Sequence, residues 1–301
     1  MSVRSSFIAA LAGAVVVSVL VRGSGGAREP AQTPPMRPLS SRPGPPPARE
    51  PEAARRCPSE MVDVAGRFCI DRWEIALVDA RSGRSLSPYY HSSPILSRRD
   101  RREWEKKAPE TGPEAARHIP LPGLPEWQLE RDVEPRAVSA PDRIPSAYLD
   151  LESARRACAN AQKRVCARNE WQMACRSERA TRHPYGAEWD PTRCNLDAAV
   201  HPGITLHGRA ETGGRDPRMN LVEYGGRTPL RPTGSLLGCA SAWEDDAVYD
   251  MEGNLDEWID DPAGTFVGGF YARDTHWGCD ARVEIHSADY YDYSLGARCC
   301  R

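Results

Sequence analysis

The sequence predicts a mixed α+β domain that is rich in loops and held together by disulfides. Alternating polar and apolar residues over 67–74 are typical of a strand, and two segments, 149–162 and 169–175, have helical spacing. After residue 177, glycine and proline are frequent and no long periodic element follows. All ten cysteines lie between Cys57 and Cys300. The pattern therefore predicts a mixed chain with two main helices.

The first 28 residues have the composition of an export signal. Arg4 precedes an apolar run over residues 7–21, and Arg22 and small residues end it. This length suits a signal peptide and is short for a membrane span. An uncleaved signal anchor is the alternative. We therefore expect an exported protein, either periplasmic, on the cell surface or secreted, with membrane attachment through this segment only.

Residues 29–56 are rich in proline and arginine. Such a segment cannot bury apolar surface and favours an extended, polyproline-like chain. We interpret it as a disordered linker that leads to one domain over residues 57–301. A proline-rich ligand for another protein is the alternative.

Within the domain, the elements are predicted in order along the chain. The first strands occupy residues 57–79, and a polar insert with charge runs and prolines follows at about 92–145. Asp150 or Ser146 can cap the first helix, and Asn169 can cap the second.

Ten cysteines in an exported chain indicate an oxidising compartment and disulfides. The even count allows five bridges. The predicted pairs are Cys57 with Cys69, Cys175 with Cys194, and Cys279 with Cys299 or Cys300. The spacings differ from the close pairs of zinc ribbons, so a zinc–thiolate site is the less favoured alternative.

A tight turn between apolar anchors lies within residues 249–258, YDMEGNLDEW. Asn254 and Glu257 supply side-chain oxygens, and the backbone carbonyl of Leu255 lies between them. Loops that present oxygens in this way bind hard cations such as calcium. A Gly-Asn turn followed by a buried tryptophan is the alternative.

Five segments carry a family resemblance when they are taken in order. They are residues 57–74, similar to an opening strand and "F-ID--EVT"; 154–175, similar to "A--C---GKRLPTEAEWE-AAR"; 183–197, similar to "YPWG" and a following "N"; 249–258, similar to "YDM-GN-WEW"; and 267–300, similar to "V-RGGS … GFR". Together they resemble the formylglycine-generating enzyme family, the sulfatase-modifying-factor domain. The resemblance covers roughly residues 57–301.

This resemblance implies a loop-rich variant of the C-type lectin fold, with short strands and long loops tied by disulfides. Members of the family vary at the insert, so the resemblance also implies that partner or ligand specificity lies there. It also implies structural calcium. The implied ligands are Asn195 and Leu196 at one site and Asn254, Leu255 and Glu257 at the other. Asp256 stands where the family has an aromatic residue, which adds negative charge to the second site.

The founding activity of the family is oxidation of a sulfatase cysteine to formylglycine by copper and oxygen. Its copper(I) site uses two thiolates, the soft ligands that this ion prefers. The equivalent stretch here, residues 268–280, contains Cys279 alone. We therefore do not expect the copper site of the family. Cys279 is interpreted as half of a disulfide, with an irregular copper site or a reactive thiol as alternatives.

Other chemistries find little support in the residues. The related sulfoxide synthases bind non-haem iron through His-x3-His-x-Glu, and none of the seven histidines forms this motif. The net charge is -2 without a basic stripe, so nothing favours nucleic acid as a partner. Motifs of serine hydrolases and nucleotide-binding loops are absent from the sequence.

The sequence therefore predicts a divergent or non-catalytic binding module whose loops bind a protein, peptide or glycan. The aromatic and acidic run over residues 289–293 is a candidate contact surface. The alternative is an oxidoreductase that acts on a protein thiol or a small substrate with an altered metal site. An accessory domain of an envelope or secretion assembly is a third interpretation.

Overall fold

The computed structural model describes residues 56–130, 133–196, 200–273 and 275–301. The predicted signal segment, and the linker up to residue 55, lie outside the described residues. Within the described part of the chain, no helix is long and apolar enough to cross a membrane. The described residues belong to one compact unit.

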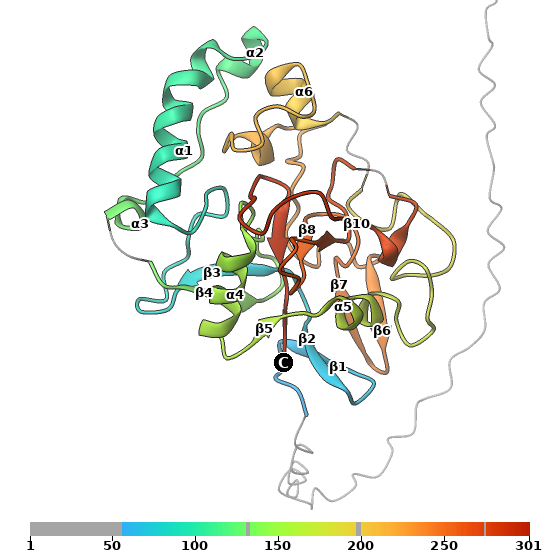
Figure 1. Cartoon of the computed structure of the whole chain (residues 1–301). Helices are drawn as coiled ribbons and strands as arrows, with labels where there is room; N and C mark the ends of the chain where they lie inside the picture. Colours follow the sequence, from blue (N-terminus) through green and yellow to red (C-terminus); the bar gives the residue numbers. More distant parts are fainter. Residues whose placement is uncertain (1–55, 131–132, 197–199, 274) are drawn as a thin grey trace, which may run out of the picture. The chain divides into compact units, whose positions relative to one another are not determined.

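The described chain is a mixed α/β domain with short elements and long loops (Figure 1). The strands are β1 (Met61–Val64), β2 (Phe68–Asp71), β3 (Ile75–Asp79), β4 (Pro135–Ser139), β5 (Arg164–Val165), β6 (Ala240–Trp243), β7 (Asp246–Tyr249), β8 (Asp256–Trp258), β9 (Phe266–Val267), β10 (Arg282–Val283), β11 (Leu295–Ala297) and β12 (Cys299–Cys300). The helices are α1 (Pro94–Lys107), α2 (Glu114–Arg117), α3 (Glu126–Glu130), α4 (Leu151–Asn160), α5 (Arg168–Cys175) and α6 (Pro202–His207), with 3-10 turns η1 (Ala108–Glu110), η2 (Met219–Leu221) and η3 (Gly278–Asp280).

Two four-stranded sheets organise the domain. The first has the order β1-β2-β12-β5, so the first and last described strands lie in one sheet. Its last strand, β12, is antiparallel to both β2 and β5. The second sheet has the order β10-β9-β8-β11, and β11 runs parallel to β8. The C-terminal strands therefore connect segments that are far apart in sequence.

The two helices that the sequence predicts are present as α4 and α5. Asp150 caps α4, since its carboxylate accepts a hydrogen bond from the backbone N–H of Ser153 at 2.7 Å. The predicted cap of α5, Asn169, is instead a residue of the helix. The carboxylate of Glu170 accepts from the backbone N–H of Ala167 at 2.9 Å and closes the first turn.

The prediction of two main helices missed α1. This helix lies in the polar insert and, at 14 residues, is the longest helix of the described residues. Its composition is mostly charged, so its apolar face is too narrow to show a helical period. Ser97, Asp100 and Trp104 form its buried face. Trp104 packs against His207 of α6 at 5.2 Å between ring centroids, and this contact holds α1 against α6. The insert is also joined to the domain by β4, which pairs with β3.

All ten cysteines form disulfides. The pairs are Cys57–Cys69, Cys158–Cys299, Cys166–Cys300, Cys175–Cys279 and Cys194–Cys239. The predicted pair Cys57–Cys69 is confirmed. The prediction of Cys175 with Cys194, and of Cys279 with Cys299 or Cys300, was wrong.

Strand geometry explains the corrected pairs. Cys299 and Cys300 are neighbours on β12, and successive side chains of a strand point to opposite faces. Cys299 therefore enters the hydrophobic cluster that contains Cys158, and Cys300 enters the cluster that contains Cys166. Cys299 and Cys300 are therefore already bonded and cannot pair with Cys279. Cys279 lies in η3, which packs against α5, and it is bonded to the last residue of that helix, Cys175.

Candidate functional site

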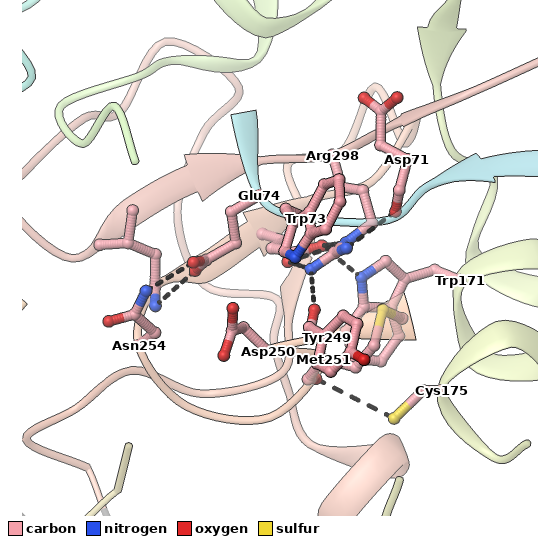
Figure 2. Close-up of polar contacts among 12 residues, drawn as sticks. Asp71, Trp73, Glu74, Trp171, Cys175, Tyr249, Asp250, Met251, Asn254 and Arg298 are labelled. Carbon is pink, nitrogen blue, oxygen red and sulfur yellow. Dashed lines mark hydrogen bonds and ion pairs between the residues drawn. The ribbon is translucent and has the colours of Figure 1, made fainter. Parts of the chain in front are cut away.

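Residues from motif segments far apart in the sequence meet at one buried guanidinium, that of Arg298 between β11 and β12. Nη2 of Arg298 donates to the carboxylate of Glu257 on β8 at 2.8 Å, and Nε donates to both of its oxygens at 3.1 Å. Nη1 donates to the carbonyl of Asp71 at 2.9 Å, and Nη2 donates to the carbonyl of Tyr249 at 2.8 Å. Figure 2 shows Arg298 with Asp71 and Tyr249. One side chain thus joins β2, β7, β8 and the C-terminal strands.

Glu257 is also held by helix α5. Nε1 of Trp171 donates to Oε2 of Glu257 at 2.7 Å. Both oxygens of the carboxylate therefore face donors from this chain. The side chains of Glu257 and Arg298 are 1% and 0% exposed, so the ion pair is isolated from solvent. Removing one partner of such a pair is costly, because an uncompensated charge stays buried.

A second carboxylate, Glu74, holds the turn that precedes β8. Its Oε1 accepts from the backbone N–H of Leu255 at 3.1 Å, and its Oε2 accepts from Nδ2 of Asn254 at 2.5 Å. Asn254 has a φ of +59°, a left-handed conformation that asparagine tolerates better than most residues. Glu74 therefore fixes both the turn and the strand that carries Glu257.

The structure brings the predicted calcium residues Asn195 and Asn254 together. Nδ2 of Asn195 donates to Oδ1 of Asn254 at 2.9 Å, and the backbone N–H of Asn254 donates to the carbonyl of Asn195 at 2.9 Å. The neighbouring Gly253 allows this approach, since a Cβ there would lie 2.3 Å from the carbonyl oxygen of Asn195. Leu196 is buried beside the same turn.

The two predicted calcium sites differ in whether their oxygens already accept hydrogen bonds within the protein. At the second site, Glu257 faces a guanidinium, and Oδ1 of Asn254 also accepts from the backbone N–H of Arg231 at 2.9 Å. These oxygens are already used within the protein and do not fit a cation. At the first site, Oδ1 of Asn195 has no hydrogen-bond partner among the described residues. In the described segments, no group of three or more His, Cys, Asp or Glu could hold a metal ion. Calcium stays a prediction.

Three buried carboxyl groups lie around the single positive charge of Arg298, namely those of Glu74, Asp250 and Glu257. Burial, reinforced by the carboxylates of Asp250 and Glu257, raises the pKa of Glu74 well above its usual range. Burial also raises the pKa of Asp250 to about 6. Oδ2 of Asp250 accepts from the backbone N–H of Gly234 at 2.6 Å. The cluster therefore retains a proton at a pH at which exposed carboxyl groups have lost theirs.

The cluster around Arg298 is closed to solvent. Glu74, Asp250, Glu257 and Arg298 are 1%, 6%, 1% and 0% exposed. A substrate could reach these groups only if the surrounding strands separated. The arrangement therefore favours a role in holding the motif segments together over a role in chemistry.

Two buried histidines each face a carboxylate. Nδ1 of His183 lies 3.0 Å from Glu252, and Nε2 of His207 lies 3.1 Å from Asp216. Burial lowers the pKa of His183, so its neutral form is favoured. These pairs fix loops and helix α6 within the domain.

Glu74 and Arg298 lie within the motif segments, but the sequence pattern gives neither of them a role. The available signal was their position, because Glu74 ends an alternating strand segment and Arg298 lies between apolar residues and two cysteines. A charged residue in such a place requires a buried partner. The sequence does not say which residue that partner is.

The surface of the described domain carries several clefts. An apolar cleft of about 660 Å³ lies between α2, α6 and residues 221–228. A cleft of mixed polarity, of about 580 Å³, lies beside His91 and Asp150 at the start of α4. Both include residues of the insert, the part of the chain where ligand specificity is expected. Their volumes lie in the range of small-ligand sites.

No protein-family model matches the chain, and no curated protein matches it. Solved structures with some similarity include PvdO from Pseudomonas aeruginosa, with 14% identity over 78% of this chain and 80% of that chain at a TM-score of 0.38. CarF has 13% identity over 78% of this chain and 85% of its own, at a TM-score of 0.34. The Major Tropism Determinant I1 variant has 14% identity over 81% of this chain and 53% of its own, at a TM-score of 0.37. Similarity at this level does not identify the family of the chain.

Proposed function

We propose that the chain is an exported, non-catalytic binding domain of the formylglycine-generating enzyme type, with a variant of the C-type lectin fold. The observation that carries this proposal is the pairing of all ten cysteines, every one of which lies among the described residues. A copper(I) site of the family kind needs two thiolates. Cys279, the cysteine of the equivalent stretch, is bonded to Cys175.

The cluster around Arg298 supports the family assignment. Arg298 belongs to the "GFR"-like end, Glu257 to the "GN-WEW"-like turn, and Trp171 to the helix that resembles "EWE". These three side chains form one hydrogen-bonded unit. A chain that keeps this unit and lacks the thiols is expected to retain the scaffold and lose the oxidation chemistry.

The disulfides also support export. Five bridges are typical of proteins that fold in an oxidising, extracellular environment, because cytosolic thiols are kept reduced. The predicted signal segment agrees with this placement. The ligand class expected from the sequence is a protein, peptide or glycan, and the clefts at the insert supply surfaces for it.

A copper(I) competition titration tests the proposal. The purified, oxidised protein is mixed with copper(I) held by a chromogenic chelator, and loss of colour reports transfer of the metal. We expect no transfer before reduction. After reduction and removal of the reductant, the released thiolates should take copper, which shows that the assay detects thiolate binding in this chain.

Tight copper(I) binding by the oxidised protein, followed by oxygen uptake with a thiol peptide, would contradict the proposal. That result would support the oxidoreductase alternative. The structural calcium that the resemblance implies remains part of the proposal at Asn195 and Leu196, where a side-chain oxygen has no partner among the described residues.

A further inference from the structure

The apolar cleft is lined by three segments that meet at one side of the domain. They are residues 113–120, which include α2, Ile204 and Thr205 of α6, and residues 221–228, which begin at the end of η2. Figure 1 shows α2 and α6 next to each other. Ala115 and Ile119 line one side, and Ile204, which is 48% exposed, lines the other. Apolar side chains that remain exposed in a concave surface mark a binding site more often than a scattered apolar residue does.

Buried polar contacts fix the walls of this cleft. Arg218 is 0% exposed and forms a double hydrogen bond with Asp216, and its Nη1 donates to the carbonyl of Ala116 on α2 at 2.9 Å. The hydroxyls of Thr205 and Tyr224 lie 2.8 Å apart and join α6 to the third wall. Pre-formed walls reduce the ordering cost of binding.

The backbone of the insert also lies directly against α6. A Cβ at Gly112 would lie 1.8 Å from the carbonyl oxygen of Leu206, so this contact requires glycine. Ala116, Leu206 and Val222 are buried beneath the cleft in one hydrophobic cluster. The floor of the cleft is therefore part of the packed core, and its shape does not depend on mobile side chains.

The cleft carries one acidic side chain, Glu223, among its lining residues. Within the described residues, Glu223 has no ion pair or hydrogen bond through its carboxylate. The other polar side chains of the lining are already used, since Thr205 contacts Tyr224 and the hydroxyl of Thr228 donates to the carbonyl of Leu230. A ligand that fits this cleft would combine an apolar body with a positive charge.

We propose that this cleft binds a peptide segment that combines aliphatic side chains with a lysine or arginine. The aliphatic groups would occupy the apolar walls, and the basic group would pair with Glu223. The carboxylate disfavours fatty acids and acidic peptides, because like charges repel. This inference rests on the proposed role as a binding domain and names its ligand class.

Fluorescence anisotropy with labelled peptides tests the inference on the oxidised full domain. The probe is an acetylated Gly-Leu-Leu-Lys-Gly peptide, and the comparison peptide has glutamate in place of lysine. We expect the basic peptide to bind about three- to fivefold more tightly than the acidic one, the gain expected of an ion pair with the exposed carboxylate of Glu223. High salt should remove most of this preference.

Two variants separate the apolar contacts from the charge. Ala115→Phe fills the cleft from an exposed position, and we expect it to weaken both peptides by tenfold or more. Glu223→Gln should remove the preference for lysine while both peptides still bind. The matched controls, Ala187→Phe and Glu188→Gln, change exposed residues of another loop and should bind like the unchanged protein.

Equal binding of both peptides by the unchanged protein, or normal binding by Ala115→Phe, would overturn the inference. Absence of peptide binding would do the same. Circular dichroism of each variant shows whether the fold is intact. The copper titration has an independent readout, so copper binding by the oxidised protein would refute the proposed function without deciding the peptide result.

Discussion

Replacing Arg298 with methionine tests the buried cluster most severely. Methionine has a similar reach and an apolar side chain, so the space stays filled while the charge is lost. Glu257 would lose its cation, and the carbonyls of Asp71 and Tyr249 would each lose a donor. Trp171 would remain as the donor to Glu257.

The magnitude follows from the burial of the pair. Both side chains are at most 1% exposed, and removal of one partner from such a pair costs about 3–5 kcal/mol of unfolding free energy. Arg298 also offsets the charge of Glu74 and Asp250. We therefore expect a loss of about 4 kcal/mol at pH 8. The loss should be smaller at pH 5, where protonation of the carboxyl groups removes the uncompensated charge.

Denaturant unfolding with the disulfides intact, followed by tryptophan fluorescence at pH 5 and pH 8, measures this loss. The exposed Arg301→Met serves as the matched control and should lie close to the unchanged protein. The double variant Glu257→Gln with Arg298→Met should recover part of the stability at pH 8. A loss below about 1 kcal/mol at pH 8, or a loss independent of pH, would refute the reasoning.

Three further outcomes are expected. Burial raises the pKa of Asp256 to about 6, although the charge of Arg273 lowers it. The protonated carboxyl therefore contributes unfolding free energy below pH 4, and this contribution is lost as the pH rises toward 6. Asp256→Asn should therefore gain about 3 kcal/mol relative to the unchanged protein between pH 4 and pH 7 in denaturant unfolding, and a constant difference would contradict this. Replacing Cys194 and Cys239 by alanine opens a loop with a sequence separation of 45 and should cost about 4 kcal/mol, whereas an unchanged thermal midpoint would argue against the bridge. Calcium at 100-fold excess over its dissociation constant should stabilise the domain by about 2.7 kcal/mol, and Asn195→Ala should abolish the shift; no shift in the unchanged protein would remove calcium from the proposal.

The sequence predicted the elements whose signals are local. Helix α4 shows its apolar period and its cap, Asp150, and the pair Cys57–Cys69 links residues that are close in sequence. Helix α1 could not be recognised in the same way, since only Ser97, Asp100 and Trp104 form its buried face. A helix whose packing depends on single residues has a weak period.

The other disulfides depend on long-range pairing that no local pattern encodes. Cys299 and Cys300 go to different partners because β12 turns them to opposite faces, and those faces exist only once β12 lies between β2 and β5. The same holds for the cluster around Arg298. The sequence identifies its members as residues of the motif segments. The contact between Arg298 and Glu257, however, follows from the parallel pairing of β11 with β8.

A count of free thiols tests the central claim most directly. The chain is produced in an oxidising compartment, unfolded without reductant in the presence of an alkylating reagent, and its intact mass is measured. Unfolding is required because the cysteines are buried. We predict no alkylation, since all ten cysteines are paired. Addition of two alkyl groups, with one on Cys279, would contradict the account and return copper chemistry to consideration.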